Sequence, residues 1–135
     1  MTRSTSDILM DFKVRTEVVV PEQRVAEVLT GAFEGGSNYW LDSLGIVDDG
    51  KKTASAHHIE DWGRRVVACL YGKVTAHASE DDGIYTINRE AIQRGLEFMS
   101  MKHPSHFSDL INENDDAETS DVLLQMVLFG DIVYG

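Results

Sequence analysis

The sequence lacks several features that define common classes of protein. Its single cysteine, Cys69, permits no intrachain disulfide and cannot form a thiolate zinc cage. No apolar run reaches the roughly eighteen residues that a transmembrane helix needs. The first residues carry no apolar segment of the secretory type. These absences predict a cytoplasmic protein that does not contact membranes.

Positive charge is missing from the end of the chain. The formal net charge is -11, and no Lys or Arg follows Lys102. Nonspecific binding to DNA or RNA requires such residues to displace counterions, so we expect no direct binding of nucleic acid. The acidic residues that are candidate partner contacts in this region are Asp109, Glu113, Asp115 and Asp116. They indicate either a face that docks on a basic protein or simply a well-solvated surface.

Motifs that carry known catalytic chemistry are also missing. The sequence contains no G-x-S-x-G, no P-loop and no G-x-G-x-x-G. The residues from Asn112 onward begin like a calcium loop, but Ala117 and Leu123 stand where that loop needs Gly and Glu. His57 and Asp61 have the spacing of a zinc pair, yet two ligands alone favour a solvated helix start. We therefore predict no metal, no cofactor and no identifiable catalytic residue, and a binding protein is favoured over an enzyme.

The residues that are present predict one α+β domain. The chain has 135 residues, of which 42% are hydrophobic, and this is enough for a single core. We assign residues 1–10 to a flexible N-terminus and residues 11–135 to the domain. The expected order is strand, helix, strand, helix, two strands of a hairpin, and then three helices. A small, mainly antiparallel sheet would be covered by these helices.

The front of the chain alternates between strand and helix patterns. Apolar and polar residues alternate over 12–18, which predicts a strand with one solvated side. Pro21 suits the start of a helix whose apolar residues repeat as far as Phe33. Gly35 and Gly36 follow, and we expect one of them to end this helix with a positive φ.

The middle of the chain continues in the same way. "NYWLDSLGIVD" predicts a strand, and the polar residues 51–56 predict a loop. Ser55 is a candidate cap for a helix that runs to Gly72. "KVTAHAS" and "IYTI" flank Asp82-Gly83, which is a good hairpin signal.

The end of the chain is rich in helix signals. Asn88 is expected to cap one helix, and Asp115 with Glu118 resembles a capping box before the last one. That last helix, 122–129, is apolar nearly all round, so it lies either in the core or against a second subunit. We expect a homo-oligomer on this ground, and a short final strand at "DIVYG".

Two sets of residues are candidates for ligand binding. They are the loop residues Ser37, Asn38, Tyr39 and Trp40, and the arginines Arg64 and Arg65. Amphipathic rings can stack on a flat ligand while neighbouring polar groups hydrogen-bond to it, and arginines can hold phosphates. The alternative is that the loop is the start of a strand with one aromatic residue in the core.

Two long motifs give the sequence a resemblance to a known family. "EGGSNYW" and "NDDAETSDVLLQ", the latter followed by "FGDIVYG", resemble a family of small bacteriophage and prophage proteins. The resemblance implies an accessory protein encoded by a phage, which acts in the cytoplasm of the bacterial host and counters host defence. It implies no catalytic residue.

The sequence therefore supports three functional hypotheses. In the first, a phage-encoded, non-enzymatic protein sequesters a small nucleotide-like ligand through the aromatic loop. In the second, its acidic face mimics nucleic acid and blocks a host protein that handles nucleic acid. The third is a small hydrolase without a recognisable motif, which would use clustered carboxylates or His77.

Overall fold

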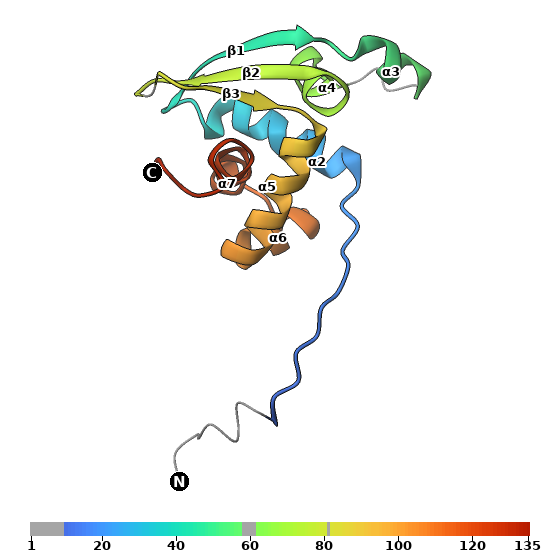
Figure 1. Cartoon of the computed structure of the whole chain (residues 1–135), viewed down its shortest axis with the longest axis vertical. Coiled ribbons are helices and arrows are strands. Elements are labelled where there is room, and N and C mark those ends of the chain that lie inside the picture. Colours follow the sequence, from blue (N-terminus) through green and yellow to red (C-terminus); the bar gives the residue numbers. More distant parts are fainter. Residues whose placement is uncertain (1–9, 58–61, 81) are drawn as a thin grey trace.

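Helices cover one face of a three-stranded antiparallel sheet (Figure 1). The computed structural model describes residues 10–57, 62–80 and 82–135. The strands are β1 (Leu41–Asp48), β2 (Lys73–Ala78) and β3 (Ile84–Ile87). The helices are α2 (Glu22–Gly31), which continues into a wide turn η1 (Ala32–Gly36), α3 (Lys51–Ala56), α4 (Arg64–Tyr71), α5 (Arg89–Lys102), α6 (Pro104–Ile111) and α7 (Ala117–Phe129). The α+β class is thus confirmed. No helix in the described part of the chain is long and apolar enough to cross a membrane.

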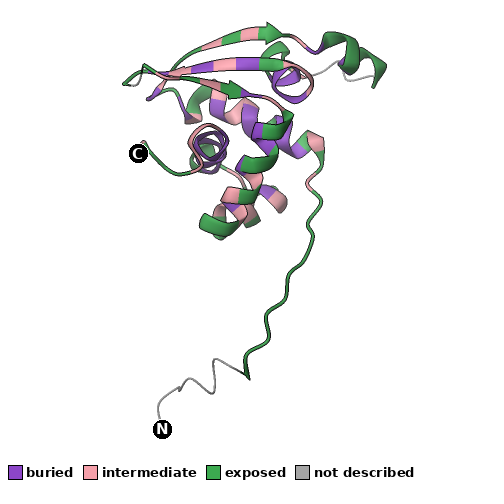
Figure 2. Cartoon of the chain, viewed as in Figure 1, coloured by how far each residue is buried: buried purple, intermediate pink, exposed green. Residues whose placement is uncertain are grey.

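The sheet has the strand order β1-β2-β3, so β1 and β3 are its edges. β2 and β3 form the predicted hairpin. The alternation predicted for β2 is confirmed, because Val74, Ala76 and Ala78 are buried while the residues between them stay at least partly exposed. This alternation buries one face of the sheet against the helices (Figure 2).

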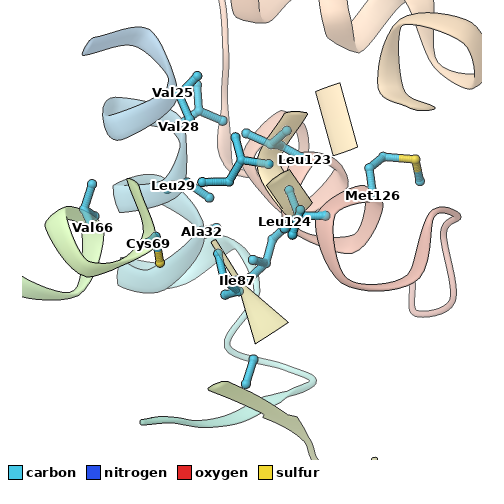
Figure 3. Packing of buried hydrophobic residues seen from close by; sticks show 14 of the residues in the cluster. Val25, Val28, Leu29, Ala32, Val66, Cys69, Ile87, Leu123, Leu124 and Met126 are labelled. Atoms are coloured by element: carbon cyan, nitrogen blue, oxygen red, sulfur yellow. The ribbon is translucent and has the colours of Figure 1, made fainter. Parts of the chain in front are cut away.

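The core lies between the sheet and the helices α2 and α7. Figure 3 shows Leu29 of α2 directed toward Leu123 and Leu124 of α7, and all three side chains are fully buried. α7 is buried continuously over 119–127, as expected for a helix that is apolar nearly all round. It is therefore the central helix of this chain's own core. Its apolar surface gives no reason to expect a second subunit.

The strand predicted over 12–18 is wrong. Residues 11–20 run away from the body as an extended, irregular segment (Figure 1). A strand needs a neighbour for its N–H and C=O groups, and alternation of side chains does not supply one. Residues 1–9, which belong to the predicted flexible N-terminus, lie outside the described residues.

Two further predicted elements differ from the structure. Residues 51–56, predicted as a loop, form the helix α3, because Lys and Ala favour helices even without an apolar stripe. Ser55 therefore lies inside α3 and caps nothing, and α4 begins only after Gly63. The final strand predicted at "DIVYG" is also wrong, since residues 131–135 are irregular.

Of the two glycines after α2, Gly36 is required by packing rather than by backbone conformation. Gly35 has φ 177°, which is extended backbone, and Gly36 does not have a positive φ, so the prediction of a left-handed glycine cap here is wrong. A Cβ on Gly36 would lie 2.6 Å from the carbonyl oxygen of Ala117, so only glycine lets η1 approach the start of α7 this closely. The left-handed glycine cap occurs instead at Gly130, where φ is 73° at the end of α7.

Side-chain caps begin two of the helices. The Oδ1 of Asn88 accepts a hydrogen bond from the backbone N–H of Ala91 at 2.9 Å, as predicted for α5. The cap of α7 is Asp116 rather than the predicted Asp115, and its Oδ1 accepts from the N–H of Thr119 at 2.9 Å. This backbone hydrogen bond lowers the pKa of Asp116.

Candidate functional site

The side chains of the predicted aromatic loop converge on one buried carboxylate, that of Asp121 in α7. Its Oδ1 accepts hydrogen bonds from the Ser37 hydroxyl at 2.8 Å and the Trp40 indole N–H at 2.6 Å. Its Oδ2 accepts from the Tyr39 hydroxyl at 2.5 Å and the Gln125 amide at 3.1 Å. Four donors satisfy the two oxygens, and this explains how a carboxylate is accommodated in the core.

This network occupies the groups that a ligand would need. Trp40 is only 2% exposed, and its ring stacks on that of Tyr134 with centroids 5.3 Å apart. Tyr39 keeps an exposed ring, but burial and the neighbouring Asp121 raise the pKa of its hydroxyl to about 12, so it stays a donor to that carboxylate. Of the four loop residues, Asn38 alone is exposed and outside this network. The loop therefore connects the start of β1 to α7 through hydrogen bonds to Asp121.

A hollow of about 590 Å³ adjoins this loop beside Tyr39. The charged side chains that line it are Glu118 and Asp121. Carboxylates repel phosphate groups, so the geometry does not favour a nucleotide at the predicted aromatic loop.

Arg64 and Arg65 lie at a different place, at the start of α4. They line a groove of about 580 Å³ together with two aromatic residues, Phe33 and Trp62. None of residues 37–40 lines this groove. The structure therefore separates the two halves of the predicted ligand site and brings the arginines to other aromatic rings.

Trp62 and Arg64 also line a second hollow, of about 560 Å³. Lys51 and Ser55 of α3 line it as well, with Asp49 before that helix. We refer to the two adjoining hollows as the Trp62 groove. Its aromatic and charged lining residues are Glu27, Phe33, Glu34, Asp49, Lys51, Trp62, Arg64 and Arg65.

The arginines of the Trp62 groove differ from Arg24 in their ion pairing. Arg24 pairs with Glu27 and with Asp115. By contrast, neither Arg64 nor Arg65 has an ion-pair partner among the described residues, and both are exposed. The first turn of α4 contains no acidic residue, and Gly63 provides no side-chain cap. Among the described residues, the N–H groups of that turn therefore lack a side-chain cap, and the helix dipole adds positive potential to the arginines.

Two of the four predicted partner-contacting acids have internal roles. Asp115 is half-buried against Arg24, and Asp116 caps α7. Glu113 is exposed in a left-handed conformation with φ 59°, and Asp109 is half-buried at the end of α6. Binding of a basic partner by these residues stays a prediction. Two carboxylates, those of Asp109 and Glu113, remain for it instead of the four that the sequence indicated.

Metal ligands do not cluster in the described part of the chain. Among those residues, no group of three or more His, Cys, Asp or Glu side chains is placed to hold a metal ion. The spacing of His57 and Asp61 cannot be followed further, because residues 58–61 lie outside the described residues.

Sequence reasoning missed both the Asp121 network and the aromatic members of the Trp62 groove. Asp121 and Gln125 are four residues apart, one at the start of the apolar part of α7 and one within it, and two polar residues at that spacing were the available signal. Phe33 is the last residue of the apolar repeat predicted for the first helix, and Trp62 falls within the helix predicted to run to Gly72. In the structure Phe33 lies in η1 and Trp62 lies before α4, and both are partly exposed.

Comparisons with known proteins do not assign the chain to a family. The chain matches no protein-family model, and no curated protein or solved structure shows a significant similarity to it. The resemblance to phage proteins therefore stays a prediction.

Proposed function

We propose that this protein is a non-enzymatic binding protein that takes a small nucleotide-like molecule at the Trp62 groove. One observation supports the proposal: the half-buried indole of Trp62 lines the same hollow as Arg64 and Arg65. Neither arginine has a carboxylate partner among the described residues. The ligand class is the one expected from the sequence. The rings that would contact it are those of Trp62 and Phe33 rather than Tyr39 and Trp40.

The aromatic part of the groove suits a flat ring. Trp62 packs partly against the core, so its orientation is supported while part of its surface stays accessible. Phe33 lines the same hollow. The volume of about 580 Å³ lies within the range of about 300–1,000 Å³ found for small-molecule sites. Offset stacking on Trp62 or Phe33 would bind a nucleobase without selecting a particular one.

The charged part of the groove suits a phosphate. A guanidinium group can bind two phosphate oxygens at once, and the uncapped start of α4 provides N–H groups near both arginines. Glu27 and Glu34 line the same hollow and would repel a purely anionic ligand. Their carboxylates can accept hydrogen bonds from the amino group of a base, so the lining favours a nucleotide over inorganic phosphate.

Mass spectrometry of small molecules released on denaturing protein purified from bacteria tests this proposal first. Calorimetry with mononucleotides and cyclic dinucleotides then measures affinity for wild type, Trp62→Ala and the double variant Arg64→Glu/Arg65→Glu. We expect at least a tenfold loss of affinity in both variants. Arg94→Glu is the matched control, because Arg94 is also exposed, lies on α5 and does not line the groove.

Equal binding by wild type and the double arginine variant would contradict the proposal, as would a lack of binding by every nucleotide tested. Sequestration of a host signal by a phage protein is the biological role that the sequence resemblance suggests. That role is part of the proposal, and its support is the resemblance alone.

A further inference from the structure

The segment of residues 11–20, which we call the arm, is extended and leaves the body of the protein (Figures 1 and 2). Residues 11–19 are exposed, and residues 16–20 line an open hollow beside α5 and α6. Phe12 is 96% exposed, Val14 80% and Val18 50%. In an extended chain, alternate side chains share a side, so these residues and Thr16 form one mainly apolar row. Large apolar side chains that are this exposed along an extended segment indicate a surface that is covered by another chain.

The edge strand β1 is incompletely covered on its inner side. The inward-facing residues of β2 are almost fully buried, at 0–1% exposure for Val74, Ala76 and Ala78. The inward-facing residues of β1, which are Leu41, Leu44 and Ile46, pack on the same core but are only half-buried. β1 has a strand neighbour on one side only within the described residues. A further strand paired with β1 at this edge would cover these three inward-facing side chains.

The other edge of the sheet does not need such cover. β3 has only four residues, and its inward-facing Ile87 is fully buried. Its inward-facing Tyr85 meets the ring of Phe129 edge-on, with centroids 4.8 Å apart. The open edge with an unfinished apolar row is therefore β1.

The arm matches the β1 edge in length and charge. Residues 12–18 would span roughly 23 Å as a strand, which is close to the length of the eight-residue β1. With its apolar row facing the helices, the arm would place Lys13 and Arg15 on the open face of the sheet. On that face β1 carries Asp42, which contacts His77, and Asp48, which lies opposite Lys73. Neither Lys13 nor Arg15 has an ion-pair partner among the described residues.

We propose that the arm of one copy adds as a fourth strand to β1 of a second copy, and that the exchange is reciprocal in a twofold dimer. Strand addition at a free edge satisfies backbone groups on both chains, and the pockets between inward residues set its register. A second copy is the occupant because the arm leaves α2 directed away from its own sheet (Figure 1). This inference is independent of the Trp62 groove, since no arm or β1 residue lines it.

The oligomeric state tests the proposal directly. Light scattering coupled to gel filtration is expected to give a dimer for the full chain and a monomer for Phe12→Asp/Val14→Asp. Both side chains are exposed, so circular dichroism and the melting temperature should show a folded body in the variant. Glu17→Gln is the matched control in the polar row, and it should remain dimeric. A monomeric wild type, or a dimer that persists in the double variant, would overturn the proposal.

Crosslinking identifies the edge. Ser43 of β1 and Ile84 of β3 both lie opposite His77, on the open face of the sheet. A mixture of Glu17→Cys and Ser43→Cys chains should form a covalent heterodimer with a short bismaleimide. A mixture of Glu17→Cys and Ile84→Cys chains should not. The native Cys69 will not interfere, because it is buried and burial raises its pKa to about 12.

Two crosslinking results would overturn the proposal. The first is a heterodimer that forms only with Ile84→Cys, which would place the arm on β3. The second is a crosslink within a single Glu17→Cys/Ser43→Cys chain that forms equally at every protein concentration, which would mean that the arm folds back on its own sheet.

Discussion

The indole N–H of Trp40 donates a hydrogen bond of 2.6 Å to Oδ1 of Asp121 inside the core. The bond joins the loop before β1 to the central helix α7. The Ser37 hydroxyl donates to the same oxygen at 2.8 Å, so the carboxylate fixes both ends of this loop. Most acidic residues of such a strongly acidic protein are expected at the surface, but Asp121 is buried and its carboxylate has a structural role.

Replacing Asp121 with alanine should destabilise the protein strongly. The change leaves the buried donors of Ser37 and Trp40 without an acceptor, and each such loss costs about 1–3 kcal/mol. We expect the free energy of unfolding in urea to fall by about 3 kcal/mol or more. Asp121→Asn keeps one acceptor oxygen and should cost less. A loss below about 1 kcal/mol in Asp121→Ala would show that the network contributes little.

Gly36 and Gly35 should differ sharply in their tolerance of alanine. A methyl group on Gly36 would meet the carbonyl oxygen of Ala117 at 2.6 Å, whereas nothing lies within 4 Å of one on Gly35. Overpacking against a backbone atom costs about 1–3 kcal/mol, so Gly36→Ala should lower the melting temperature. Gly35→Ala is the control and should stay close to wild type. Equal melting temperatures for both variants would contradict the close approach of η1 and α7.

The elements that could be predicted from the sequence are those whose signals are local. The hairpin of β2 and β3 follows from alternation around a turn, and the Asn88 cap follows from one side chain and its neighbouring N–H groups. The strand β1 and the burial of α7 follow from local apolar content. Each of these depends on residues close together in the chain.

The features that could not be predicted depend on contacts between distant residues. Residues 12–18 have the side-chain pattern of a strand, but nothing in their sequence shows that this chain leaves them without a neighbouring strand. Gly36 is explained by Ala117, and Trp40 by Asp121, each more than eighty positions away. The Trp62 groove was missed for the same reason, because η1 and the start of α4 meet only in the folded chain.

The cap of α7 should make stability depend on acid pH. Hydrogen bonding from the backbone N–H of Thr119 lowers the pKa of Asp116 in the folded state. The stabilisation is therefore present above the pKa of the unfolded state, about 3.9 for Asp, and is lost as pH falls through the lower folded value. At pH 7, Asp116→Ala should cost about 1 kcal/mol. The difference from wild type should shrink as the pH falls below about 3.9, the pKa of the unfolded state.

Asparagine at this position provides the matched control. Asp116→Asn retains a capping oxygen but has no carboxyl to titrate, so its stability relative to Asp116→Ala should not change across this acid range. The measurement is urea unfolding at a series of pH values. A gap between wild type and Asp116→Ala that is constant from pH 7 to about pH 2 would rule out the titrating cap.

One side chain of α7, that of Gln125, makes three hydrogen bonds to the backbone of the C-terminal segment. The Oε1 of Gln125 accepts hydrogen bonds from the backbone N–H groups of Val133 at 2.7 Å and Tyr134 at 2.8 Å. Its amide donates to the carbonyl oxygen of Tyr134 at 3.0 Å. Gln125 thus gives the tail the bonds that a neighbouring strand would give, although the predicted final strand does not form.

Replacing Gln125 with methionine should free the two backbone N–H groups of this segment while leaving the core folded. Methionine has a similar volume but no acceptor, so the N–H groups of Val133 and Tyr134 lose their protection. Hydrogen exchange at these two amides should be slow in wild type and should accelerate at least tenfold in Gln125→Met, whereas the amides of α7 itself change little. Val133→Ala is the control, because it keeps the backbone N–H and its side chain is exposed. Rapid exchange of these amides in the wild-type protein would show that Gln125 does not hold the tail.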